Sequence, residues 1–208
     1  MAVTFDDGYV DNYETVLPLL NKWGIPATFF VTAGLVERDP DVLARFRFLY
    51  SRHSDDVFRP MTWSQVIEMR DAGMEVGGHG YRHSNMMLLP PAEMKAELQR
   101  SKNVIEDRLG AEIATMGYPF GKPRRHVTPE VARIAGEVGF RSAGLVLHRG
   151  VHQSDHPLQI PRFVIIRDTI DKLRARVIGA FDIVGTGQQR MPLWAGKLMS
   201  PQDFKFGT

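Results

Sequence analysis

Two adjacent aspartates near the start of the chain and two histidines four residues apart are the side chains that could perform chemistry together. Asp6 and Asp7 follow one short apolar run, and His79 and His83 follow another. On a helical turn, residues four apart face the same way, so both imidazoles could bind one ion. Two imidazoles and one carboxylate suit zinc, cobalt, nickel or iron, and they leave positions open for water and substrate.

The adjacent carboxylates also provide a base. Gly80 follows His79, so this is not the helical metalloprotease motif, in which a glutamate stands at that position. With Asp7 on the metal, the neighbouring Asp6 could accept a proton from the attacking water. A carbonyl polarised by the ion and held by a backbone N–H would complete an amide or ester hydrolase.

Each of these clusters directly follows a predicted strand. The aspartates follow Ala2–Phe5, the histidine segment follows Met74–Val76, and the segment Tyr118–Gly121 follows Ile113–Gly117. The C-terminal ends of parallel strands share one rim of a sheet or barrel. Residues distant in the sequence are therefore expected to be neighbours in space.

Helical patterns alternate with these strands. Thr62 and Gln65 form a capping box, Thr128 is an N-cap, and Pro18 is expected to kink the first helix. The predicted helices are Asn12–Trp23, Trp63–Ala72, Pro91–Leu109, Glu130–Val138 and one capped by Asp168 or Thr169 that runs through Ile178; further strands are predicted at Ala27–Val31, Phe140–Leu147 and Phe163–Ile166. This order implies mostly parallel pairing, which an open doubly wound sheet and a closed barrel both satisfy.

The same motifs resemble those of the polysaccharide deacetylase family, also called carbohydrate esterase family four. The resemblance rests on Thr4–Gly8, His79–His83 and Tyr118–Gly121, and it extends through Ile25–Phe30 and Pro161–Arg162. It covers roughly residues 3 to 180, and its first motif is highly specific.

The resemblance implies a distorted (β/α) barrel with fewer than eight parallel strands. It also implies hydrolytic removal of acetyl groups from N-acetylated or O-acetylated sugars, with an acetylated carbohydrate as the binding partner. By motif match Asp6 is the catalytic base, while Asp7, His79 and His83 hold a divalent metal ion, zinc being the first expectation.

The third motif departs from the family pattern. Tyr118, Pro119 and Phe120 are expected to bind substrate, and the amide N–H of Phe120, which stands at the family's usual tyrosine position, would face the oxyanion. Many members brace the base with an arginine two residues before the proline, where this chain has Gly117. Arg162 could supply a substitute guanidinium, although a structural role fits that residue equally well.

The general acid has no clear counterpart. His148 resembles the family's late histidine locally, but it comes too soon after the third motif and is interpreted as a strand-end residue. His126, His152 and His156 lie in polar loops and are expected to be solvated. The acid is therefore left unassigned.

The domain boundaries follow from composition. Residues 1–184 are predicted to form the catalytic domain, and residues 185–208, rich in Gly, Gln and Pro, a loosely ordered tail. The long segment Thr32–Pro60 carries four aromatics, Phe46, Phe48, Tyr50 and Phe58. A helix over Asp41–Tyr50 that buries these rings is favoured over an exposed platform for sugar rings.

Composition excludes several classes of function. The 208 residues are 43% hydrophobic and 24% charged with a formal net charge of +2, which is ordinary for one globular domain. Scattered basic residues argue against nucleic acid, and no apolar run is long enough to span a membrane. Cysteine is absent, which removes disulfides and thiolate sites.

No signal peptide is visible, which predicts a cytoplasmic protein unless the N-terminus is truncated. The oligomeric state is left open.

Three other functional classes fit the same residues. The chain could hydrolyse small cyclic amides or imides on the same scaffold. It could be a weakly active or non-catalytic carbohydrate-binding relative, since the acid and the arginine of the third motif are missing. A non-haem iron oxygenase also uses two histidines and one carboxylate, but it would give Asp6 no role.

Overall fold

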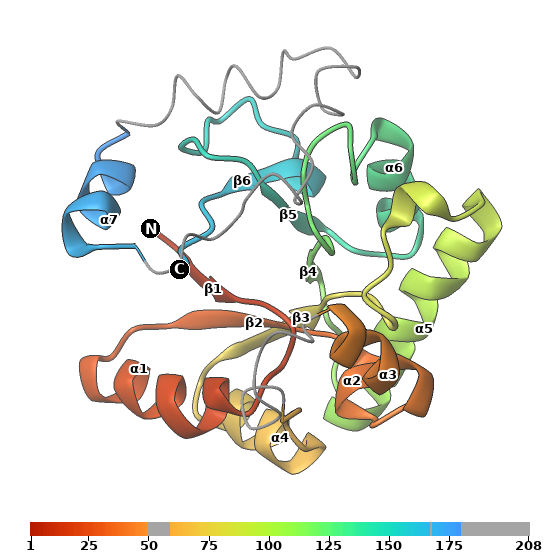
Figure 1. Cartoon of the computed structure of the whole chain (residues 1–208), viewed down its shortest axis with the longest axis horizontal. Helices are drawn as coiled ribbons and strands as arrows, with labels where there is room; N and C mark the ends of the chain where they lie inside the picture. Colours follow the sequence, from red (N-terminus) through yellow and green to blue (C-terminus); the bar gives the residue numbers. More distant parts are fainter. Residues whose placement is uncertain (50–58, 167, 180–208) are drawn as a thin grey trace.

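A computed structural model describes residues 1–49, 59–166 and 168–179. Within these residues, six parallel strands form one curled sheet in sequence order, with helices outside it (Figure 1). The strands are β1 (Val3–Phe5), β2 (Ala27–Val31), β3 (Glu75–Gly78), β4 (Thr115–Gly117), β5 (Ser142–Val146) and β6 (Ile160–Arg162). The predicted fold, a distorted (β/α) barrel with fewer than eight strands, is confirmed.

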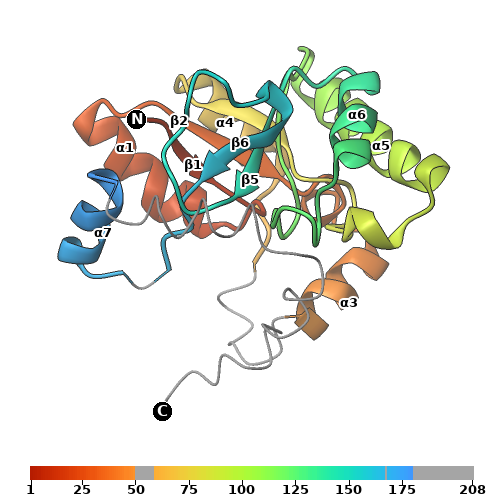
Figure 2. The same cartoon turned by 90° about the horizontal axis from the view of Figure 1, so that it is seen from above.

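Helices connect most of the successive strands. In both views α5 and α6 lie next to each other at one end of the molecule and α1 lies at the opposite end (Figure 1, Figure 2). The helices are a π-helical turn η1 (Asn12–Val16), α1 (Leu17–Trp23), α2 (Ala33–Val36), α3 (Pro40–Leu49), α4 (Trp63–Asp71), α5 (Pro91–Leu109), α6 (Pro129–Glu137) and α7 (Ile170–Val177), with short 3-10 turns η3 (Met86–Leu88) and η4 (Pro157–Gln159). None of the described helices is long and apolar enough to cross a membrane.

Local sequence signals determine where the helices begin and end. Thr62 and Gln65 form both hydrogen bonds of the predicted capping box, and the Thr128 side chain accepts from the amide of Val131. Gly24 and Gly110 end their helices in the left-handed conformation, which a glycine adopts without steric cost. These four signals confirm four predicted helix ends.

The first predicted helix forms as two consecutive helical parts whose geometry changes just before its proline. The π-helical turn η1 comes first, and the α-helix begins at Leu17, so that Pro18 falls within its first turn. The Leu17 amide donates to the Asn12 carbonyl five residues earlier, so the backbone stays helical up to the proline and the wider π-helical turn lies directly before it.

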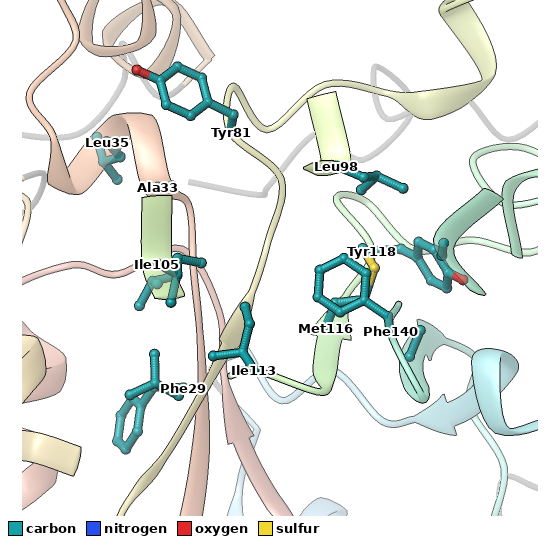
Figure 3. Close-up of a cluster of buried hydrophobic side chains, with 14 of the residues drawn as sticks. Phe29, Ala33, Leu35, Tyr81, Leu98, Ile105, Ile113, Met116, Tyr118 and Phe140 are labelled. Atoms are coloured by element: carbon teal, nitrogen blue, oxygen red, sulfur yellow. The ribbon is translucent and has the colours of Figure 1, made fainter. Parts of the chain in front are cut away.

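The core lies between the sheet and helix α5. Leu98 and Ile105 of α5 are fully buried and pack toward Phe29, Met116 and neighbouring side chains of the sheet (Figure 3). Fully burying one such aliphatic side chain contributes about 1.5–3 kcal/mol relative to leaving it exposed. This packing holds β3 and β4, the strands that lead into two of the three motifs.

Two predictions need correction. Phe163–Ile166 was expected to be a strand, but the strand is Ile160–Arg162, and the residues after it are irregular. The inserted helix forms as α3 and buries Phe46, whereas Phe48 is 82% exposed, so the rings are not buried as a group. Tyr50, Phe58 and the predicted tail of residues 185–208 lie outside the described residues.

Candidate metal centre and active site

The strand register brings the three motifs to one rim. Phe5 of β1 pairs with Phe29 of β2, and farther along Val31 pairs with Gly78 of β3, which in turn pairs with Met116 of β4. The strands end within one or two residues of these pairs. The motifs that follow β1, β3 and β4 therefore meet at the same C-terminal rim, as the sequence predicts.

Asp7, His79 and His83 converge at this rim. The Nε2 atoms of His79 and His83 lie 3.5 and 3.4 Å from Oδ1 of Asp7. One ligand atom from each of the three residues lies within 4.8 Å of the other two. Both histidines are buried and the aspartate is partly buried. This spacing and this donor set fit one divalent cation.

Hydrogen bonding supports this fit. The Nδ1 atom of His79 lies 2.7 Å from the carbonyl oxygen of Gly117, which can only accept, so Nδ1 carries the proton and Nε2 presents a lone pair. That lone pair faces Oδ1 of Asp7, a buried oxygen with no hydrogen-bond partner among the described residues. Two electron-rich atoms in this arrangement fit a cation between them.

The protonation equilibria of Asp7 and His83 also bear on this donor set. Burial raises the pKa of Asp7 to about 6, against the lowering effect of His79, and the charge of Asp6 adds to the rise. Burial also holds the pKa of His83 well below its ordinary value, with His79 and Arg45 acting in the same direction. His83 is therefore a neutral imidazole at pH 7, which is the form that binds metal.

Left-handed backbone conformations aim these side chains. Asp7 has φ of 77° and His83 has φ of 54°, both unusual for residues with a Cβ. The His83 ring then packs against Phe46 and Phe120, with ring centroids 5.4 and 4.7 Å away. Apolar rings on both sides fix its orientation and limit the access of water.

Asp6 points to a different partner. Its two carboxylate oxygens accept hydrogen bonds of 2.8 and 3.0 Å from the guanidinium of Arg162, which also donates to the Thr4 hydroxyl at 3.0 Å. Burial alone would raise the pKa of Asp6, but the electrostatic effects of His79 and Arg162, together with the hydrogen bonds from Arg162, outweigh it and hold that pKa below its ordinary value. Asp6 is thus ionised and oriented.

Two glycines provide the space for Arg162. A Cβ on Gly144 would lie 2.4 Å from its Nε atom, and a Cβ on Gly117 would lie 3.1 Å from one of its terminal nitrogens. The guanidinium also lies 5.0 Å from the centre of the Phe30 ring. Many family members have an arginine where this chain has Gly117. Here the guanidinium beside Asp6 comes from Arg162 of β6, and Gly117 lies next to it.

The third motif contributes less than its sequence implies. The Tyr118 side chain is 1% exposed and its hydroxyl donates to the Leu158 carbonyl at 3.0 Å, so it belongs to the core and the expectation that it binds substrate is wrong for its side chain (Figure 3). Pro119 is buried with its Cγ facing Gly80. Only Phe120 reaches the site, in a left-handed conformation with φ of 61°.

The other histidines of the described residues lie apart from the two proposed ligands. His152 and His156 are exposed, as expected, and His148 follows β5 and contacts Phe163 and Arg176. His126 differs from its prediction: it is half-buried, with its ring 5.2 Å from that of Phe120, and burial lowers its pKa to about 4.

Comparisons with known sequences agree with this geometry. The sequence profile described as Polysaccharide deacetylase matches residues 1–143. The protein YxkH of Bacillus subtilis, provisionally named a polysaccharide deacetylase, is 25% identical over 141 residues, which make up 68% of this chain and 42% of YxkH. The poly-beta-1,6-N-acetyl-D-glucosamine N-deacetylase of Staphylococcus aureus is 22% identical over 177 residues, 84% of this chain and 57% of that protein. The chain spans about half the length of these relatives.

Solved structures share the fold. The deacetylase PplD of Streptococcus pyogenes, in complex with acetate, superposes with a TM-score of 0.69 at 22% identity, covering 84% of this chain and 69% of PplD. IcaB of Ammonifex degensii superposes with a TM-score of 0.65 at 25% identity, covering 84% of this chain and 71% of IcaB.

Zinc affinity is expected to fall as the pH drops below about 6. There the Asp7 carboxyl must lose a proton before it can bind, so the affinity should decrease by about tenfold per pH unit. Above that pH the carboxylate is already ionised, and the neutral His83 adds no dependence. Competition with a chromophoric chelator across the pH range measures this. An affinity unchanged between about pH 7 and pH 5 would contradict the Asp7 assignment.

Gly144→Ala is expected to displace Arg162 from Asp6 and to destabilise the fold by about 1–3 kcal/mol, because the new Cβ collides with the middle of a held side chain. Urea unfolding measures the change, with Ser142→Ala in the same strand as a control. The double variant with Arg162→Met should cost less than the sum of the two single changes. Additive costs would show that the glycine acts independently of Arg162.

Proposed function

This chain belongs to the polysaccharide deacetylase family, and we propose that it is a metal-dependent hydrolase of acetylated sugars. In this proposal it removes acetyl groups from N-acetylated, or O-acetylated, residues of a poly- or oligosaccharide. The bond broken in the N-acetyl case is a carbon–nitrogen bond outside peptides.

One observation carries the proposal: two adjacent carboxylates of the same strand end have different partners. Asp7 faces two imidazole nitrogens and Asp6 faces a guanidinium. The first environment suits a ligand, and the second suits a base that stays ionised beside the reacting atoms. A hydrolase that activates water needs both roles, and a binding protein needs neither.

In this mechanism Asp7, His79 and His83 hold a divalent ion, for which zinc is the first candidate. When bound, such an ion polarises the substrate carbonyl and promotes ionisation of water. Asp6 accepts the proton of the attacking water. Arg162 occupies one lone pair on each Asp6 oxygen and leaves the others free, so it fixes the carboxylate without blocking it.

The segment after β4 is assigned to the substrate. The Phe120 amide N–H donates to the oxygen that becomes negatively charged as water adds to the acetyl carbonyl. Its left-handed backbone is the kind of strained conformation that functional sites retain. The general acid that protonates the leaving nitrogen is left unassigned.

The substrate class comes from the family and its relatives. The Staphylococcus aureus relative is named for poly-beta-1,6-N-acetyl-D-glucosamine, and the PplD structure contains acetate, the product expected of deacetylation. Identities of 22% support an acetylated sugar but not a particular polymer. Hydrolysis assays with acetylated oligosaccharides and, in parallel, with cyclic ureides and imides would distinguish a deacetylase from the alternative hydrolase of cyclic amides.

The deciding experiment separates metal binding from turnover. His79→Ala and His83→Ala are expected to abolish stoichiometric metal uptake, because each removes one of three ligands. Asp6→Asn should keep the metal and lose about 10²–10⁴-fold in acetate release, since the amide cannot accept the proton. Metal analysis of the purified protein and an acetate assay with zinc, cobalt, nickel and iron provide the two readouts.

His152→Ala is the control for removing a histidine, because that residue is exposed and far along the chain from the motifs. It should change neither metal content nor acetate release. Full activity in Asp6→Asn would overturn the assignment of the base. Metal uptake without turnover on any acetylated sugar would favour a carbohydrate-binding role.

Arg162→Met is expected to keep the metal and to lower kcat by about tenfold or more, because Asp6 is no longer held in place. Loss of the positive charge also raises the Asp6 pKa, and a base must be ionised, so the acidic limb of the pH–rate profile should move to higher pH. Arg162→Lys retains the positive charge without the paired hydrogen bonds. Its kcat and its pH–rate profile should lie between those of the unaltered chain and of Arg162→Met. A profile that does not move would show that Arg162 has no influence on the base.

A further inference from the structure

The loop between the two proposed histidine ligands is held by its main-chain groups. The carbonyl oxygens of Gly80 and Tyr81 accept hydrogen bonds of 3.2 and 2.9 Å from the amides of Ala33 and Gly34, at the start of α2. A Cβ on Gly34 would lie 2.6 Å from the Tyr81 oxygen, so only a glycine permits this approach. These bonds satisfy the loop's acceptors on one side.

Its donors are satisfied from the other side by a carboxylate. Glu97 of α5 is only 8% exposed, and its Oε1 accepts a hydrogen bond of 2.5 Å from the amide of Arg82. Burial raises the pKa of Glu97, and the main chains of Arg82 and Tyr81 act against this rise. Two successive amides aimed at one anion form a compact anion-binding arrangement. Glu97 thus binds the loop midway between His79 and His83.

A second contact one helical turn along α5 reinforces the first. The Arg100 guanidinium lies 3.5 Å from the centre of the Tyr81 ring, and it donates to the Tyr81 hydroxyl at 2.8 Å. That hydroxyl donates to Asp39 at 3.0 Å. Residues three apart on a helix lie on one face, so Glu97 and Arg100 hold the same loop together.

Burial of Glu97 has a cost that needs an explanation. A carboxylate removed from water is unfavourable unless it is hydrogen-bonded, and α5 could place an apolar residue there beside Met94 and Leu98. A buried acceptor does what an apolar side chain cannot: it selects the one loop conformation in which both amides point inward. In that conformation His83 takes its left-handed φ and its ring meets that of His79, with centroids 4.9 Å apart.

We propose that Glu97 is a positioning residue that sets the relative placement of His79 and His83 by binding the main chain between them. The inference rests on the proposed function, because it assumes that these two histidines bind metal. It adds a residue outside the three motifs whose loss weakens metal binding without removing a ligand. Partners of this kind typically change metal affinity by about 10–100-fold.

The test is zinc affinity, measured by competition with a chromophoric chelator on the full 208-residue chain. Glu97→Ala is expected to weaken zinc binding by about 10–100-fold, and Glu97→Gln, which retains one acceptor oxygen, by less. Glu93→Ala is the matched control. Glu93 is exposed one turn earlier on α5, and together with Glu97 it lines a surface cavity of about 340 Å³. Loss of its carboxylate should leave the zinc affinity unchanged.

A second readout separates positioning from general stability. The absorption spectrum of the cobalt-substituted protein reports ligand geometry, and it should change in Glu97→Ala at temperatures where circular dichroism shows an intact fold. Unchanged zinc affinity in the folded variants, or failure of both Glu97 variants to fold while Glu93→Ala folds, overturns the proposal. No zinc binding by the unaltered chain would instead refute the metal centre itself, and the role of Glu97 with it.

Discussion

The site depends on one ion pair that joins the first strand to the last. Arg162 at the end of β6 reaches both oxygens of Asp6, just beyond β1, and the hydroxyl of Thr4 within it. β1 and β6 are the two outer strands of the described sheet, and no ladder joins them there. The sheet must curl for the ends of β1 and β6 to meet. The curvature of the sheet therefore places Arg162 beside Asp6, the proposed base. Geometry of this kind cannot arise in a flat sheet of the same strands.

Much of the fold could be predicted because its local signals agree with each other. Pro91–Leu109 has an N1 proline, an apolar face and a terminal glycine, and Ala27–Val31 is a short apolar run between breakers; both are observed unchanged. The last strand was predicted at Phe163–Ile166, an apolar run, whereas the observed strand contains Pro161, a residue that is rare inside strands. A proline is tolerated in Ile160–Arg162 since β6 lies at the edge of the described sheet, where one missing N–H breaks no second ladder.

The site was predictable only where side-chain types identify it. The sequence suggested the grouping of Asp7 with the histidines, because parallel strands bring their ends together. Arg162 was only one possibility, since its reach depends on glycines in other strands. Glu97 was not found at all: its partners are backbone amides, which leave no trace in a pattern of side chains, although a charge on the apolar face of α5 was visible. Tyr118 was misassigned because a motif match does not say which way a side chain points.

The two glycines beside the guanidinium have a wider consequence for how related sequences can vary. A Cβ on residue 117 would lie 3.0 Å from the Phe30 ring and 3.1 Å from a terminal nitrogen of Arg162, so a larger side chain there would crowd the guanidinium. An arginine on β4 at position 117 and one on β6 at position 162 would therefore compete for the same space beside Asp6. A large side chain at either glycine would leave less room for a guanidinium from the sixth strand.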